Sequence, residues 1–127
     1  MKLKMQEIIN FSSFFTKVRS QKLPFKTSYR LTLLSQEIEK HFNFYQEELQ
    51  NILQEYGKKD EKGELILTDD GQGVKLNEET MNEAYEKLSE LRMLDVELPE
   101  FKFCVDDFDK VELAPEEMVA IMPFIQE

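Results

Sequence analysis

Hydrophobic residues recur every three or four positions along most of the chain, and this spacing predicts helices as the main elements. In the clearest run, between residues 28 and 56, bulky apolar side chains step by 4, 4, 3, 4, 3 and 4 positions: Leu34, Ile38, Phe42, Tyr45, Leu49, Ile52 and Tyr56. This rhythm is typical of a helix that packs along its length against other helices. Gly57 follows, and we predict that it ends the helix in the left-handed conformation that glycine adopts easily.

Three shorter helices are predicted on either side of this long one. The first runs from about Met5 to Ser20 and carries an apolar stripe with one further aromatic residue beside it: Ile8, Phe11, Phe15 and Val18, with Phe14 adjacent. The second has Asn77 as its cap and continues to about Met93. The last begins at Pro115, a residue type favoured in the first helical turn, and Pro123 limits it to about two turns.

Strand signals are short. Residues 64–68 alternate between polar and apolar side chains, a DDGQG turn follows, and residues 74–76 alternate again, which predicts a β-hairpin. Phe101–Val105 has the alternation of a half-buried strand. The whole pattern predicts one domain, residues 1–127, of the α+β class and dominated by helices. We expect the long helix to pack antiparallel on a shorter helix, with a small hairpin or sheet at one end.

The helix predicted after Asn77 carries two stripes. Met81, Ala84, Leu88 and Leu91 share an apolar face, whereas Glu79, Glu83, Glu86 and Glu90 recur at the same rhythm on an acidic face. Like charges at this spacing destabilise a helix by about 0.2–0.5 kcal/mol per pair. Three explanations stay open: the acidic face is solvated, the acidic half of the chain meets the chain's own basic first thirty residues, or this acidic half meets the basic surface of another protein.

The charge of the chain is distributed very unevenly. The formal net charge is −10, yet residues 1–30 contain seven Lys and Arg against a single Glu. Residues 64–127 contain five basic and eighteen acidic residues, a net charge of −13. The first thirty residues interleave cations with aromatic rings, as nucleic-acid sites do, but the overall negative charge opposes attraction to phosphate. We therefore expect a protein partner with a basic surface and disfavour direct nucleic-acid binding.

Candidate catalytic and metal-binding groups are few. His41 is the only histidine, and no third group that would orient it as a catalytic base can be named. Cys104, the only cysteine, lies in the predicted strand and is expected to be a small core thiol. Thr68, Asp70, Gln72, Gly73 and Glu79 match some positions of an EF-hand loop but lack most of its carboxylates. The sequence therefore predicts a protein that is not an enzyme and that holds neither a metal nor a cofactor.

Compartment signals are weak but agree with one another. One cysteine excludes an intramolecular disulfide, and no apolar run approaches the roughly 20 residues that a membrane span needs. We read no targeting or anchoring segment, expect no membrane partner and place the protein in the cytoplasm.

Three stretches together show a resemblance: EIIN near the start, LPFKTSYRL at residues 23–31 and EYGKKDEKGEL at residues 55–65. They resemble a family of small bacteriophage proteins of unknown function, in which a long helix ending in Tyr-Gly precedes a charged hairpin and a second helix. The resemblance implies a phage origin and thus the cytoplasm of a host cell. It transfers no catalytic residue.

These observations favour an acidic, non-enzymatic binding protein that blocks a basic surface of a host protein, such as a nucleic-acid-handling or defence enzyme. The candidate partner-binding residues form two acidic rows: Glu79, Glu83, Glu86 and Glu90, and Asp106, Asp107, Asp109, Glu112, Glu116 and Glu117. The alternative is a structural or assembly protein of the virion that uses the long helix as an oligomerisation seam. Apolar residues off the main stripe motivate it: Leu31, Leu33, Phe44 and Leu53. The oligomeric state stays open.

Overall fold

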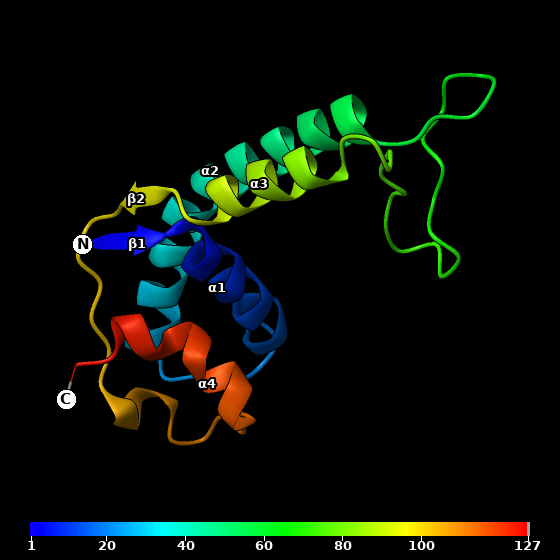
Figure 1. Ribbon diagram of the computed structural model, residues 1–127. Coiled ribbons are helices and arrows are strands. Elements are labelled where there is room, and N and C mark those ends of the chain that lie inside the picture. Colours follow the sequence, from blue (N-terminus) through cyan, green and yellow to red (C-terminus); the bar gives the residue numbers. More distant parts are fainter. Residues whose placement is uncertain (127) are drawn as a thin grey trace. The chain divides into compact units, whose positions relative to one another are not determined.

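The computed structural model describes residues 1–126 and is dominated by helices (Figure 1). The elements in chain order are β1 (Lys2–Lys4), α1 (Met5–Val18), α2 (Phe25–Tyr56), α3 (Met81–Arg92), β2 (Asp95–Glu97), a 3₁₀ turn η1 (Val105–Phe108), α4 (Pro115–Ile121) and a 3₁₀ turn η2 (Met122–Phe124). They form two compact units. The first contains Met1–Asn43 and the chain from Asp95 onward, and the second contains Phe44–Leu94.

The core of the first unit is built on α1. Its buried residues are Met5, Ile8, Phe11, Phe14 and Val18, so the predicted stripe is confirmed except that Phe14 rather than Phe15 enters the core. Figure 1 shows α4 lying against α1, and the Phe11 ring meets that of Phe124 edge-on at 5.4 Å. Helix α4 spans the two turns that its flanking prolines predict.

The sheet of this unit pairs two strands from distant parts of the chain. β1 and β2 run antiparallel with Leu3 opposite Val96, and both side chains are buried. At the exposed rim, Lys4 Nζ lies 2.5 Å from Asp95 Oδ1, and hydrogen bonding to this ammonium holds the pKa of Asp95 below its ordinary value. The alternation at residues 101–105 wrongly predicted a strand. Only Phe103 pairs there, with Ile125, and Val105 already begins η1.

Helix α2 has 32 residues and is therefore about 48 Å long. It begins three residues earlier than predicted, because the carbonyl of Pro24 accepts a hydrogen bond from Ser28 N at 3.0 Å and so supplies the first helical acceptor. The predicted apolar stripe is confirmed: Leu34, Ile38, Tyr45 and Tyr56 are buried, and Phe42, Leu49 and Ile52 are half-buried. Residues 25–43 pack in the first unit and residues 44–56 in the second.

In the second unit, α3 lies antiparallel to the C-terminal part of α2 (Figure 1). Asn77 N donates to the Tyr56 carbonyl at 2.9 Å, which fixes the point where the chain returns. The predicted start of α3 was three residues too early. Asn77 forms a turn with Thr80, and Thr80 occupies the N-cap position. The apolar stripe holds: Ala84 and Leu91 are buried, and Met81 and Leu88 are half-buried.

Between α2 and α3, three extended segments replace the simple hairpin that the alternation predicted. Their backbones form a closed ring of hydrogen bonds: Lys58 N donates to Lys75 O, Lys75 N to Ile66 O, and Ile66 N to Lys58 O. The pairing of Leu67 with Val74 confirms the hairpin within this larger arrangement. In such a ring none of the three segments is left as an unpaired edge.

Candidate functional site

A groove runs between the C-terminal part of α2 and α3, entirely within the second unit. Its volume is about 350 Å³, and we call it the acidic groove. It is lined by Phe44, Glu48, Asn51, Ile52 and Glu55 of α2 and by Lys87, Glu90, Leu91 and Leu94 from α3 and the residues after it. This volume lies within the range of pockets that take ligands or side chains of a partner.

The floor of the acidic groove is apolar. Leu91 is buried and Ile52 half-buried, whereas Phe44 and Leu94 remain 46% and 42% exposed. Phe44 is exposed because it lies one position before Tyr45, which belongs to the buried stripe, and so it projects from the flank of α2. Exposed apolar surface framed by polar residues is typical of interaction sites.

The rim of the groove carries three carboxylates, those of Glu48, Glu55 and Glu90, against one ammonium, that of Lys87. Within residues 1–126, no salt bridge involves any of these three carboxylates. The groove therefore offers an apolar surface between carboxylates that no cation of residues 1–126 neutralises in a salt bridge. Of the described residues, no serine, threonine, cysteine or histidine side chain lines the groove.

The first predicted acidic row is placed mostly as expected. Glu83, Glu86 and Glu90 are exposed and recur at helical spacing on α3, but Glu79 lies on the turn before the helix and leaves the row. Glu83 also has a structural role. Burial, and then the charges of Glu55 and Glu83 together with their hydrogen bonds to the hydroxyl, raise the pKa of Tyr56. Only Glu90 belongs both to the row and to the acidic groove.

The second predicted row lies in the other unit, on η1, α4 and the loop between them. Two of its six residues cap backbone: Asp107 accepts from Cys104 N at 2.8 Å, and Glu117 accepts from Ala114 N at 3.1 Å. Glu117 also lies 2.5 Å from Lys17 Nζ, and its pKa is lowered by that hydrogen bond. The remaining four are exposed: Asp106, Asp109, Glu112 and Glu116.

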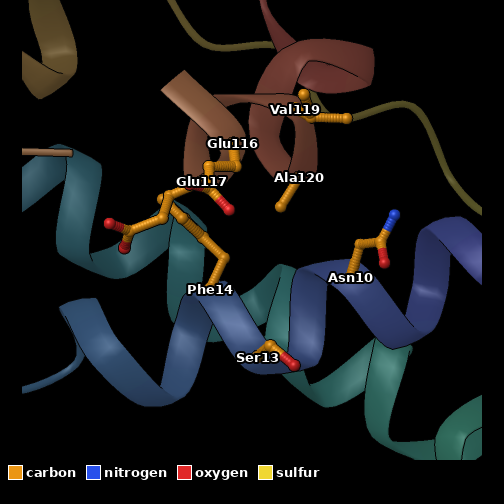
Figure 2. Close-up of a pocket in the computed structure, with 7 residues that line it drawn as sticks. All are labelled: Asn10, Ser13, Phe14, Glu116, Glu117, Val119 and Ala120. Atoms are coloured by element: carbon orange, nitrogen blue, oxygen red, sulfur yellow. The ribbon is translucent and has the colours of Figure 1, made fainter. Parts of the chain in front are cut away.

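A smaller cavity of about 310 Å³ is lined by residues of both α1 and α4 and lies next to this row (Figure 2). Asn10, Ser13 and Phe14 line it from α1, and Glu116 and Glu117 line it from α4. Lys17 therefore already neutralises one of its two carboxylates. With Asp95 held by Lys4 in the same unit, part of the acidic C-terminal half does meet the chain's own basic beginning, as one of the sequence-based explanations expected.

Other residues singled out by the sequence can now be placed. His41 is half-buried on α2, whereas Cys104 is exposed, because the strand that was predicted to bury it does not form. Residues 68–73 form a turn in which Asp70 accepts from Gln72 N and from the Thr68 hydroxyl. Residues 1–126 contain no group of three or more acidic, His or Cys side chains suited to holding a metal ion. None of the helices in that range has the length and apolarity to cross a membrane.

Sequence reasoning missed most of the acidic groove. Glu48 and Glu55 belong to a helix whose pattern was read for its buried stripe, and they are spaced seven residues apart, two helical turns on one side of α2. The sequence feature that indicated this groove was Phe44, a large apolar residue that lies off the buried stripe of α2.

Comparison with known proteins adds no relative. No protein-family model matches the chain, and neither the curated proteins nor the solved structures give a match.

Proposed function

We propose that this protein is a non-enzymatic protein-binding module whose acidic groove holds a basic, amphipathic segment of a partner protein. The observation that carries the proposal is the combination of an exposed apolar floor, Phe44 and Leu94, with a rim of three carboxylates that form no salt bridge within residues 1–126. An amphipathic helix that lays its apolar face into a groove is a recurring mode of peptide recognition. A Lys- or Arg-rich flank on that helix complements the rim.

The two parts of the groove make different contributions. Fully burying a large apolar side chain is worth about 1.5–3 kcal/mol, and Phe44 and Leu94 are 46% and 42% exposed, so each can add about half of that when a partner covers it. Exposed rim charges contribute little net affinity but steer association and select the sign of the partner. Salt then screens the steering, since the Debye length falls from about 10 Å at 0.1 M to about 3 Å at 1 M ionic strength.

In this proposal the module acts by covering a surface that its partner needs. A basic segment of an enzyme that handles nucleic acid is such a surface, because phosphate binding requires it. Together with the resemblance to small phage proteins, this makes the protein a phage-encoded inhibitor of a host protein in the host cytoplasm. The exposed carboxylates of Glu83 and Glu86, next to Glu90 on α3, extend the negative surface beyond the groove.

Calorimetric titration with a short synthetic amphipathic helix made of leucine and lysine tests the proposal. We expect saturable binding that weakens as salt rises, and no binding of the corresponding leucine and glutamate helix. Glu48→Lys combined with Glu90→Lys removes binding. Glu47→Lys is the matched control, because Glu47 neighbours Glu48 on α2 in the second unit and is exposed but does not line the groove.

Two results contradict the proposal. One is equal binding of both peptides, and the other is equal loss of binding in Glu47→Lys and in the groove variant. Circular dichroism of each variant shows whether it keeps its helices.

A further inference from the structure

The N-terminal part of α2 exposes an apolar face that no described residue covers. Phe25 is 85% exposed, Tyr29 59% and Leu33 38%, and their spacing of four residues places them in one row along the helix. Thr27, Leu31 and Leu34, on the opposite side of the same helix, are buried. The row therefore points away from the core of its unit, so packing within that core does not explain why these apolar side chains are present.

Cations accompany this row. Lys26 and Arg30, each one position after an exposed aromatic residue, form a parallel row four residues apart, and both are exposed. Within residues 1–126 neither takes part in a salt bridge. We call Phe25, Lys26, Tyr29, Arg30 and Leu33 the cationic-aromatic face. It is a basic, amphipathic helical surface, the same chemistry that the acidic groove is proposed to hold.

We infer that the partner of the acidic groove includes a second copy of this chain, whose cationic-aromatic face docks into it. This inference rests on the proposed function of the groove. The apolar row meets the exposed floor of Phe44 and Leu94, while the two cations meet the rim carboxylates. The lengths are similar: Leu33 lies eight positions after Phe25, about 12 Å along the helix, and on the α2 side of the groove Glu55 lies eleven positions after Phe44, about 16.5 Å.

The docking joins two different surfaces and is therefore heterologous. Each pair leaves a free face on one copy and a free groove on the other, so further copies add until a ring closes or a filament grows. Association increases with protein concentration and weakens with salt, because the rim charges lie at the surface. A basic host segment that binds the groove competes with the second copy and releases it.

Sedimentation analysis of the full chain with two complementary variants tests the inference. The face variant carries Phe25→Ser and Lys26→Glu, and the groove variant carries Glu48→Lys and Glu90→Lys. We expect the wild-type chain to associate at low salt and each variant alone to be monomeric. A mixture forms a one-to-one pair that grows no further, because only one intact groove and one intact face remain.

Lys110→Glu is the control for the face variant, since Lys110 is exposed in the same unit but lies off this face. Glu47→Lys again controls for the groove variant, and both controls associate like the wild type. Three results overturn the inference: a wild-type chain that stays monomeric at high concentration and low salt, a face variant that still associates with itself, or a mixture that forms no pair.

The failure of this inference is distinguishable from failure of the proposed function. A groove that binds the leucine and lysine helix while the wild-type chain stays monomeric keeps the proposed function and removes self-association. If the groove binds neither the leucine and lysine helix nor a second copy of the chain, the proposed function and the self-association are both wrong.

Discussion

Gly57 offers a sharp test of the architecture, because sequence and structure give it different roles. The sequence predicted a left-handed residue that ends α2. In the structure only Gly63 and Gly71, among residues 1–126, have positive φ, at 80° and 73°. Gly57 instead has no room for a side chain: an added Cβ would lie against the carbonyl oxygen of Leu53 and 2.5 Å from Leu65 Cδ2.

The size of the effect follows from these contacts. Carbon atoms pack best at about 3.5–4.0 Å, so Leu65 would have to move by about 1 Å, and the Leu53 carbonyl belongs to the backbone and has less freedom to move. Overpacking of this kind costs about 1–3 kcal/mol. In a chain of 127 residues, about 2.1 cal/mol/K of unfolding entropy per residue converts each kcal/mol into a shift of about 4 °C in Tm. We expect Gly57→Ala to lower Tm by about 4–11 °C.

Comparing alanine with asparagine at two glycines separates crowding from conformation. Asparagine tolerates positive φ better than alanine, so Gly63→Asn should be milder than Gly63→Ala, where nothing lies within 4 Å of an added Cβ. At Gly57 the larger asparagine should be worse than alanine. Thermal melting gives Tm, and hydrogen exchange of the Lys58, Ile66 and Lys75 amides reports on the ring beside Gly57. A Gly57→Asn chain that melts above Gly57→Ala would refute the steric explanation.

Three further changes have defined outcomes. Phe11→Ala should lower the free energy of unfolding by about 3–5 kcal/mol in denaturant titration, because Phe11 is fully buried and meets the Phe124 ring edge-on. The pKa of Tyr56 is raised in the folded chain, so the free energy of unfolding should fall as pH rises from about 10, the ordinary pKa of tyrosine, through the raised pKa. Tyr56→Phe should remove this alkaline loss, whereas Tyr29→Phe, on an exposed residue, serves as control. Glu90→Gln should stabilise α3 by a few tenths of a kcal/mol yet weaken binding of the leucine and lysine helix in the calorimeter.

The helical part of the fold was predictable because its signal is local. The stripe of α2 has seven apolar members between Leu34 and Tyr56, and each helical turn repeats the same three- or four-residue spacing. Helix ends were less predictable. Asn77 and Thr80 are both good caps, but Asn77 O accepts from Thr80 N in a turn, and the helical bond from Ala84 N goes to Thr80 O.

Strand pairing depended on partners far away in the chain. β1 has three residues and pairs with a segment more than ninety positions later, so nothing in KLK indicates a strand. The clear alternation at residues 101–105 failed for the opposite reason. Phe103 finds only Ile125 as a partner, and without a ladder Val105 and Cys104 stay at the surface.

The candidate site was predictable in its charge but not in its shape. The acidic row on α3 could be read from spacing alone. The groove could not, because it needs Glu48 and Glu55 from α2 beside Glu90 from α3, and their proximity depends on how the two helices pack. The ten acidic residues proposed from the sequence also fall in two different units, and one of them, Glu117, is paired with Lys17.

Repulsion between the carboxylates of the acidic row lowers the stability of α3, and this helps to distinguish a binding surface from one that is only solvated. Glu86 and Glu90 repel each other at a spacing of four residues, and Glu83 and Glu86 at three, while Lys87, four residues after Glu83 and three before Glu90, offsets part of this repulsion. A solvated face has no need of this arrangement, since a lysine or glutamine at position 90 would be at least as stable. In the proposed function, a cation of the partner lies near Glu90 at the rim of the groove and compensates for this repulsion. Stability and binding then respond to Glu90 with opposite signs, which a surface exposed only to water does not produce.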